Sequence, residues 1–438
     1  MKTIFRYTNI GLLTLGIFAV GAIGIFGQDA CADADGQTKL GDQFRSEFAV
    51  KTEEGRKKAI ATGKTFLEKY GSCESTKELS EYLKGQTPKM EAALAKIIAD
   101  RIRLERIARF EGALKTSAWD EVFAAGKELL ANYPDDLRTV EIVLATVGGE
   151  EAFKANFKYS DETIRYAKAS IADLEGGKSF NIGTEERLGI AKDGYNYAFP
   201  NRPDAVGFMN LYIGYILHVN KKDKAAAAPF LYKASQSVSG AAKNPVSFEL
   251  IGSYYFEELN KVVEKIQIAA KDQKDTDAPD VAQKKVDDIK ALVAMSNGIS
   301  ERAMDAFSRA YDLGKDSAYK TRMKKNVADA YKVRFAKETG VDEWISATVK
   351  KPFINPTTPI APISDPEPTT TTTGTPGAST GNPAGANLGA TNGSGGGTAN
   401  GSGIGGPKPA TNTTKSAPAP AKPVNATIAK PGSIKNKK

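Results

Sequence analysis

The stretch SAWDEVFAAGKELLANYPDD, residues 117–136, constrains the fold of this chain more than any other. Its large apolar residues recur at intervals of three, four and seven, which places them on one face of a helix. Ser117 has the position of an N-terminal cap, and Tyr133-Pro134 is predicted to end the helix. Small residues around Gly126 leave room for a neighbouring helix, so the stretch predicts a unit that stacks against others. The apolar face consists of Trp119, Val122, Phe123, Leu129 and Leu130.

Residues 1–32 predict export. Two basic residues precede an uncharged apolar run of 17 residues, Ile10 to Phe26. This order is typical of a secretory signal, and cleavage after Gly27 or after Ala32 fits the sequence. An uncleaved membrane anchor is the alternative. In both cases we expect the body to lie in the periplasm or cell envelope and to contact the membrane only through this N-terminal segment.

The chain has two cysteines, Cys31 and Cys73. In an oxidising compartment, two cysteines without a third competitor can form a disulfide, which would tie the N-terminal arm to the first helices. The bridge requires that any cleavage precede Cys31. If the mature chain began at Asp33, Cys73 would be a lone thiol. The sequence before Cys31 lacks the leucine typical of bacterial lipoprotein sites, so we do not expect lipidation.

The body, residues 33–351, is predicted to be all-α. No run of alternating polar and apolar residues is long enough for a strand. We expect an N-terminal helical segment over residues 33–86. Thr87-Pro88 is then predicted to begin a long helix, because proline is favoured in the first helical turn. Further on, Ser300 is predicted to begin another helix, after a highly charged stretch that reads as a loop or an exposed helix start.

Three groups of residues in the body have the spacing of paired helices, in which a small residue lets the two helices touch. They are Trp119, Val122, Gly126, Leu129 and Pro134; Phe248, Ile251, Gly252 and Tyr255; and Ala303, Phe307 and Ala310. The second group resembles the first helix of a tetratricopeptide repeat (TPR), and the other two resemble its second helix, with the proline that ends it in the first group. The resemblance implies a TPR-like α-solenoid of helical hairpins over residues 87–351, as in exported bacterial proteins of this kind.

The repeat spacing departs from that of the family. Corresponding second-helix positions lie near Val122, Ile164, Ala226 and Ala303, which are 42, 62 and 77 residues apart. The family repeats with a period of about 34 residues. We therefore expect degenerate, interrupted repeats.

Residues 352–438 are predicted to be a disordered tail. Fourteen of the 21 prolines lie beyond Lys351, and no aromatic residue follows Phe353. Such a segment cannot bury enough apolar area to offset the entropy lost on ordering. It could serve as a solvating spacer, or its lysines could make weak contact with anionic cell-wall polymer. These lysines are Lys408, Lys415, Lys422, Lys430, Lys435, Lys437 and Lys438.

The charge distribution argues against a nucleic-acid partner. The formal net charge is +8, but the seven tail lysines and the two basic residues before the apolar run account for the excess. The body between them is nearly neutral, whereas nucleic-acid binders usually carry a clustered basic patch.

The sequence offers no combination of residues for catalysis or for a cofactor. His218 is the single histidine, so neither a histidine metal site nor a catalytic triad can be assembled around it. We interpret it as a packed or capping residue. Gly177-Lys178-Ser179 is similar to the end of a phosphate-binding loop, but the required first glycine is replaced by Ala172. We predict a protein that is not an enzyme and binds no cofactor or metal.

Aromatic residues are concentrated between Tyr195 and Phe256. Most are expected to pack between helices. The alternative is that some line an exposed concave face and bind an extended peptide, because tyrosine rings make good anchors. We predict an exported, non-enzymatic scaffold that binds another envelope protein or peptide, with a glycan-binding or solute-binding protein as the alternative. The candidate partner-binding aromatics are Tyr212, Tyr215, Tyr254 and Tyr255.

Overall fold

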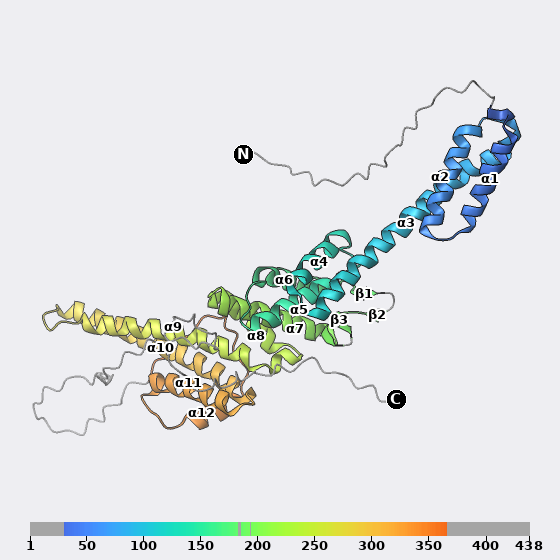
Figure 1. Ribbon diagram of the computed structural model, residues 1–438. Helices are drawn as coiled ribbons and strands as arrows, with labels where there is room; N and C mark the ends of the chain where they lie inside the picture. Colours follow the sequence, from blue (N-terminus) through green and yellow to red (C-terminus); the bar gives the residue numbers. More distant parts are fainter. Residues whose placement is uncertain (1–29, 183–184, 193, 366–438) are drawn as a thin grey trace, which may run out of the picture. The chain divides into compact units, whose positions relative to one another are not determined.

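The computed structural model describes residues 30–182, 185–192 and 194–365 of the chain, as shown in Figure 1. The chain divides into two compact units, residues 1–108 (unit 1) and residues 109–438 (unit 2).

Two of the predicted segments fall outside the described residues. Most of the predicted signal or anchor, residues 1–29, lies there, and so does the tail from residue 366 on, with all of its lysines. Among the helices of the described chain, none has both the length and the hydropathy needed to cross a bilayer.

Unit 1 is built around a hairpin of two helices, α1 (Ala34–Ala49) and α2 (Glu53–Tyr70). Both helices begin at a capping side chain: the Asp33 carboxylate accepts from the Gly36 amide, and the Thr52 hydroxyl accepts from the Gly55 amide. Short 3-10 turns at Ala30–Ala32 and Glu74–Thr76 flank the hairpin, and α3 (Lys77–Thr116) begins after the second turn. The buried core contains Phe44, Ala59, Ile60, Phe66, Tyr70, Cys73, Leu83 and Met90.

A disulfide joins Cys31 to Cys73 and ties the N-terminal arm to the end of α2. The Cys73 side chain is buried. Two hydrogen bonds reinforce the link. The Tyr70 hydroxyl donates to the Asp33 carboxylate at 2.7 Å, and Gln37 Nε2 donates to the Cys31 carbonyl at 3.2 Å. The arm is therefore part of the packed unit.

Reduction of the Cys31–Cys73 bridge is expected to lower the free energy of unfolding of unit 1. The bridge spans 42 residues of sequence, and closing a loop of that length in the unfolded chain stabilises the fold by roughly 4 kcal/mol. Urea unfolding followed by far-UV circular dichroism measures the change. Tryptophan fluorescence should not change, because both tryptophans, Trp119 and Trp344, lie in unit 2.

The matched control is the double variant Cys31→Ser/Cys73→Ser, whose stability should be the same with and without reductant. A loss below about 1 kcal/mol on reduction of the native chain would contradict the loop-closure argument.

Helix α3 shows that the helix start predicted at Thr87-Pro88 is wrong. The helix runs through Pro88 without ending, although proline removes a backbone hydrogen bond from a helix interior. Leu83 and Met90, on either side of the proline, are both buried in the core of unit 1. Packing of the two side chains therefore keeps the segment helical where local propensity alone predicts a new start.

Unit 2 consists largely of helices in which neighbours along the chain pack together. A π-helical turn, Ile216–Asn220, extends α7, and a 3-10 turn, Gly240–Lys243, precedes α9. The described chain is thus mostly helical, which confirms the coarse prediction of a helical fold. After α3 the helices are α4 (Trp119–Asn132), α5 (Thr139–Phe153), α6 (Ser160–Glu175), α7 (Arg202–Tyr215), α8 (Lys224–Gln236), α9 (Pro245–Lys271), α10 (Pro279–Leu313), α11 (Ser317–Phe335) and α12 (Val341–Thr348).

The prediction of a body without strands is wrong, because two short antiparallel hairpins lie between α6 and α7. The first pairs β1 (Asn181–Ile182) with β2 (Glu185–Glu186), and the second pairs β3 (Gly189–Lys192) with β4 (Tyr195–Ala198). Strands of two to four residues are too short to show alternation. The signal in the sequence was the Asp193-Gly194 dipeptide, which is typical of hairpin turns.

The start of α9 has both a cap and a proline, whereas the starts predicted at two serines are wrong. Asn244 caps α9 by accepting from the Val246 amide, with Pro245 in the first turn. Ser117, by contrast, has a left-handed φ of 55° and does not cap α4, which begins at Trp119. Ser300 is fully buried inside α10 and begins no helix.

Glycines set the distance between paired helices in unit 2. A Cβ added at Gly126 of α4 would lie 2.8 Å from the Leu144 side chain of α5. At Gly252 of α9, it would lie 2.7 Å from the Phe307 ring of α10. The helix that resembles a first TPR helix therefore packs against the one that resembles a second, with the glycine at the contact.

Gly252→Ala is expected to lower the stability of unit 2 by about 1–3 kcal/mol, because the added methyl overlaps a buried ring. The matched control is Gly112→Ala on α3, where nothing lies within 4 Å of the added atom. That variant should be more stable by about 0.5–1 kcal/mol, because alanine favours a helix over glycine. Urea unfolding followed by tryptophan fluorescence measures both. Equal effects of the two substitutions would show that the Phe307 contact does not limit the packing.

Candidate functional site

Residues 352–365, which we call the strap, form a segment without helix or strand that packs on the helices of unit 2 and turns once, where the Thr358 amide donates to the Asn355 carbonyl at 3.1 Å. The prediction of disorder from residue 352 on is therefore wrong for this segment. Its backbone pairs with α10: the Ile363 amide donates to the Ala294 carbonyl at 2.8 Å, and Asn297 Nδ2 donates to the Ile363 carbonyl at 3.0 Å. The composition rule failed because two buried side chains, Phe353 and Pro356, and hydrogen bonds to the body hold a segment whose other residues are mostly exposed.

Arginines of α10 and α11 hold the strap at two further points. Arg302 donates to the Asn355 carbonyl at 3.3 Å and to the Thr358 hydroxyl at 3.0 Å. Arg334, whose side chain is 8% exposed, donates to the Asp365 carboxylate at 2.8 Å. Charged donors of this kind make stronger hydrogen bonds than neutral ones. The strap is thus fixed near both of its ends.

Phe353 anchors the start of the strap in an aromatic site. Its side chain is buried, with the ring centroid 5.0 Å from that of Phe248 and 5.9 Å from that of Tyr232. The Arg309 guanidinium lies over the ring, 5.1 Å from its centroid. Contacts between aromatic rings and between a cation and a ring add to the burial of the side chain.

Arg309 also holds the turn that leads into the strap. It donates to the carbonyls of Lys351 and Thr348 and to the Asp305 carboxylate, the last at 2.8 Å. Burial raises the pKa of the Asp305 carboxyl, and the neighbouring Arg309 acts against this increase. One guanidinium therefore connects α10, the end of α12 and the Phe353 site.

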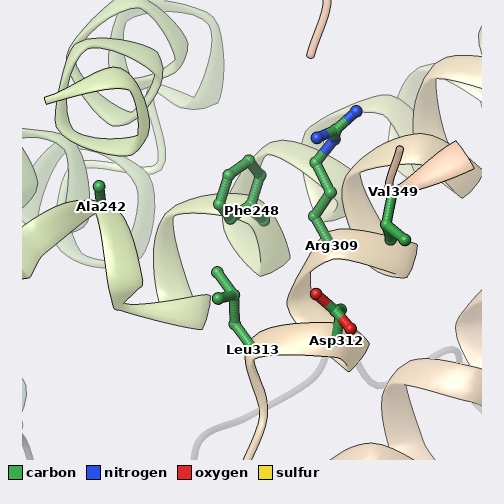
Figure 2. A pocket seen from close by; sticks show the side chains of 6 residues that line it. All are labelled: Ala242, Phe248, Arg309, Asp312, Leu313 and Val349. Carbon is green, nitrogen blue, oxygen red and sulfur yellow. The ribbon is translucent and has the colours of Figure 1, made fainter. Parts of the chain in front are cut away.

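An open pocket of about 210 Å³ lies beside this site (Figure 2). Phe248 and Arg309, which contact Phe353, are part of its lining, and Asp312 adds a carboxylate. The other lining residues are Ala242, Leu313 and Val349.

Small residues of α10 form the surface beneath the second half of the strap. A Cβ added at Gly298 would lie 2.3 Å from the Ala361 carbonyl oxygen and 3.0 Å from the Ile360 side chain. Ser296, Asn297 and Gly298 are all buried. The residues just before Ser300, where a helix start was predicted, thus lie in the interior of a helix that accepts a backbone at close range. The strap lies on a surface formed by α8 to α11, which we call the groove. The strap and the groove form our candidate site.

Three of the four predicted partner-binding tyrosines lie in the core. Tyr212, Tyr215 and Tyr255 are 5%, 2% and 1% exposed, so the prediction that they line an open surface is wrong for them. Tyr212 fills the space above Gly149, and the pKa of its hydroxyl is raised well above the usual value by burial. Tyr254 is half-buried beside Tyr255. The interpretation of the aromatic cluster as packing between helices fits these positions.

The residues predicted for repeat packing are mostly buried. Trp119 is half-buried, with its ring edge against Tyr197, and Pro134 is exposed in the turn after α4. Those in the core are Val122, Gly126, Phe248, Ile251, Gly252, Ala303, Phe307 and Ala310.

His218 lies in the π-helical turn after α7 and is buried. Its Nε2 atom has no hydrogen-bond partner within the described chain. Burial, aided by the positive charge of Lys224, lowers the pKa of the imidazole to about 4, and a hydrogen bond with the Leu250 backbone acts in the opposite direction. Within the residues described, no group of three or more histidine, cysteine or acidic side chains could hold a metal ion.

The stability of unit 2 is expected to fall between pH 6.5 and pH 4 because of His218. Only the unfolded state takes up the proton in this window, since the pKa falls from 6.5 in the unfolded chain to about 4 in the folded one. The stabilisation is present above pH 6.5, and about 3 kcal/mol is lost on reaching pH 4. The control is His218→Gln, which does not titrate. Urea unfolding followed by tryptophan fluorescence should show a smaller loss for this variant, and an equal loss would rule out His218 as the source.

The strap and its groove remain the principal candidate site. They bring together Phe353, the α10 arginines and the buried small residues of α10, none of which the sequence analysis had assigned to one surface. The chain was compared with protein-family models, with curated proteins and with solved structures, and no match was found.

Proposed function

We propose that this protein is an exported, non-enzymatic scaffold of the cell envelope that binds extended segments of other proteins along a TPR-like solenoid. The paired helices support the solenoid, because two of the three groups with TPR spacing lie on consecutive helices in contact, α9 and α10. The apolar run after the basic N-terminus supports export. The Cys31–Cys73 bridge does so too, since disulfides persist in oxidising compartments.

The strap is the observation that carries the proposal. A helical surface that holds a proline-containing segment without helix or strand has the chemistry needed to hold such a segment of a partner. Three hydrogen bonds with the helices involve backbone groups of the strap: the carbonyls of Asn355 and Ile363 and the Ile363 amide. Backbone contacts of this kind are used widely in peptide recognition, with side-chain sites adding specificity.

A glycan-binding function is the second candidate, favoured by a cluster of aromatic residues at the second β-hairpin. Tyr195 and Tyr197 stack with centroids 5.9 Å apart and an angle of 28° between their rings. Both are half-buried, and Asn196 between them is exposed. The Trp119 ring stands at 86° to that of Tyr197, so the three rings do not form one flat platform. This departure makes peptide binding the better-supported function.

Crosslinking and affinity co-purification from intact envelopes tests the proposal. The full chain is compared with a version that lacks residues 366–438. This truncation keeps the strap, which packs on the body. We expect the same defined protein to be recovered with both versions, because recognition is assigned to the helical body.

A Tyr197→Ala variant of the full chain is the matched control. It should recover the same protein, because Tyr197 lies on the hairpin and away from the strap contacts. If glycan is recovered without a defined protein, and if Tyr197→Ala no longer recovers that glycan, the glycan-binding function replaces the scaffold function.

A further inference from the structure

The groove beneath the strap has the features of a site that recognises a peptide. Asn297 and Arg302 donate to carbonyls of the strap, and the Ala294 carbonyl accepts from one of its amides. These are contacts that any extended chain in the same register can make. The strap is covalently part of this chain. The groups that bind it belong to the helices, so they do not require that link.

Three side-chain features restrict which segment fits. The site formed by Tyr232, Phe248 and Arg309 takes an aromatic ring. At Gly298 the backbone of the bound segment comes so close to α10 that no side chain fits between them. The buried Arg334 binds a carboxylate. A ligand therefore needs an aromatic residue and a carboxylate at the spacing of Phe353 and Asp365, with a backbone between them that can turn as the strap does at residues 355–358.

Prolines in the strap favour that backbone. Pro356 is buried, and Pro359 and Pro362 follow at intervals of three. Each proline fixes φ at about −65°, which suits the turn at Pro356 and the irregular chain at Pro359 and Pro362, so a segment of this composition loses less entropy when it docks. The fit thus depends on a preorganised backbone together with a few anchors.

We propose that the strap is a built-in competitor, and that the groove binds a partner's proline-containing segment with an aromatic and an acidic residue at the spacing of Phe353 and Asp365. This inference rests on the proposed scaffold function and names the partner chemistry and its regulation. Because the strap is attached to the site, its effective concentration there is on the order of millimolar. A partner's segment binds in the groove when its local concentration exceeds the effective concentration of the strap, or when the strap is released.

Peptide binding to the purified full chain tests the proposal. The probe is a fluorescently labelled synthetic peptide with the sequence of residues 350–365, and the readout is fluorescence anisotropy. The receptor is either the native chain or Phe353→Ala/Asp365→Ala, which weakens the strap and leaves the groove unchanged. We expect the double variant to bind the peptide at least about tenfold more tightly, because loss of a buried aromatic anchor commonly reduces affinity by this factor or more.

Two further variants, made in the double-variant background, locate the binding. Gly298→Ala should weaken peptide binding at least about tenfold, because its methyl meets the backbone of the bound segment. Gly112→Ala, the same substitution in open space on α3, should leave the affinity unchanged. Circular dichroism of all variants checks that they are folded.

A second measurement uses the native chain alone. Isotopically heavy peptide in excess should accelerate amide hydrogen exchange at Ile363 of the attached strap, since the strap is displaced. The proposal is overturned if the native chain and the double variant bind the peptide equally or not at all, if Gly298→Ala has no effect, or if exchange at Ile363 does not change.

The outcomes separate this inference from the scaffold function. If the peptide binds as expected but no envelope protein is captured, the groove is a peptide site and the scaffold role fails. If the native chain and Gly298→Ala capture the same protein and neither the native chain nor the strap-weakened variant binds the peptide, the scaffold role stands and the strap site fails.

Discussion

Helical glycines determine how closely the elements of unit 2 approach one another. At Gly126, Gly149 and Gly252, a side chain of another helix lies 2.8, 2.2 and 2.7 Å from where a Cβ would be. At Gly298 the same space is taken by the Ala361 carbonyl oxygen, at 2.3 Å. In each case the absence of a side chain on the glycine lets a neighbouring group approach, and at Gly298 that group belongs to a backbone. Because interiors are close-packed, each of these positions leaves no room for even one methyl group.

The sequence predicted the features that depend on local chemistry. The close approach of a neighbouring helix at Gly126 lies where expected. Predictions failed where residues distant in the sequence determine the local structure. Pro88 stays within a helix because a core forms on both sides of it, and Ser300 lies inside α10 because the strap and neighbouring helices cover the small residues around it. Neither effect can be read from a window of sequence.

The candidate site was the hardest part to predict. Tyrosines drew attention because they are large and amphipathic, but three of them fill the spaces between helices. The site that the structure brings together depends on Arg302, Arg309 and Arg334, which the sequence presents as ordinary charges on solvated helices. Their role follows from the position of the strap alone. Only Phe353, the last aromatic residue of the chain, marked the site in the sequence.

Low apolar content indicates disorder because such a segment gains too little burial to offset its loss of entropy. The strap shows how both sides of that balance can change. The groove already contains aromatic rings, a guanidinium and small residues. Docking of a segment with one buried aromatic residue therefore gains more free energy than the composition of the segment suggests. Pro356, Pro359 and Pro362 reduce the entropy to be lost, because fewer backbone states are open to the free chain. Proline content by itself therefore does not separate a free tail from a docked segment; a complementary surface on the body does.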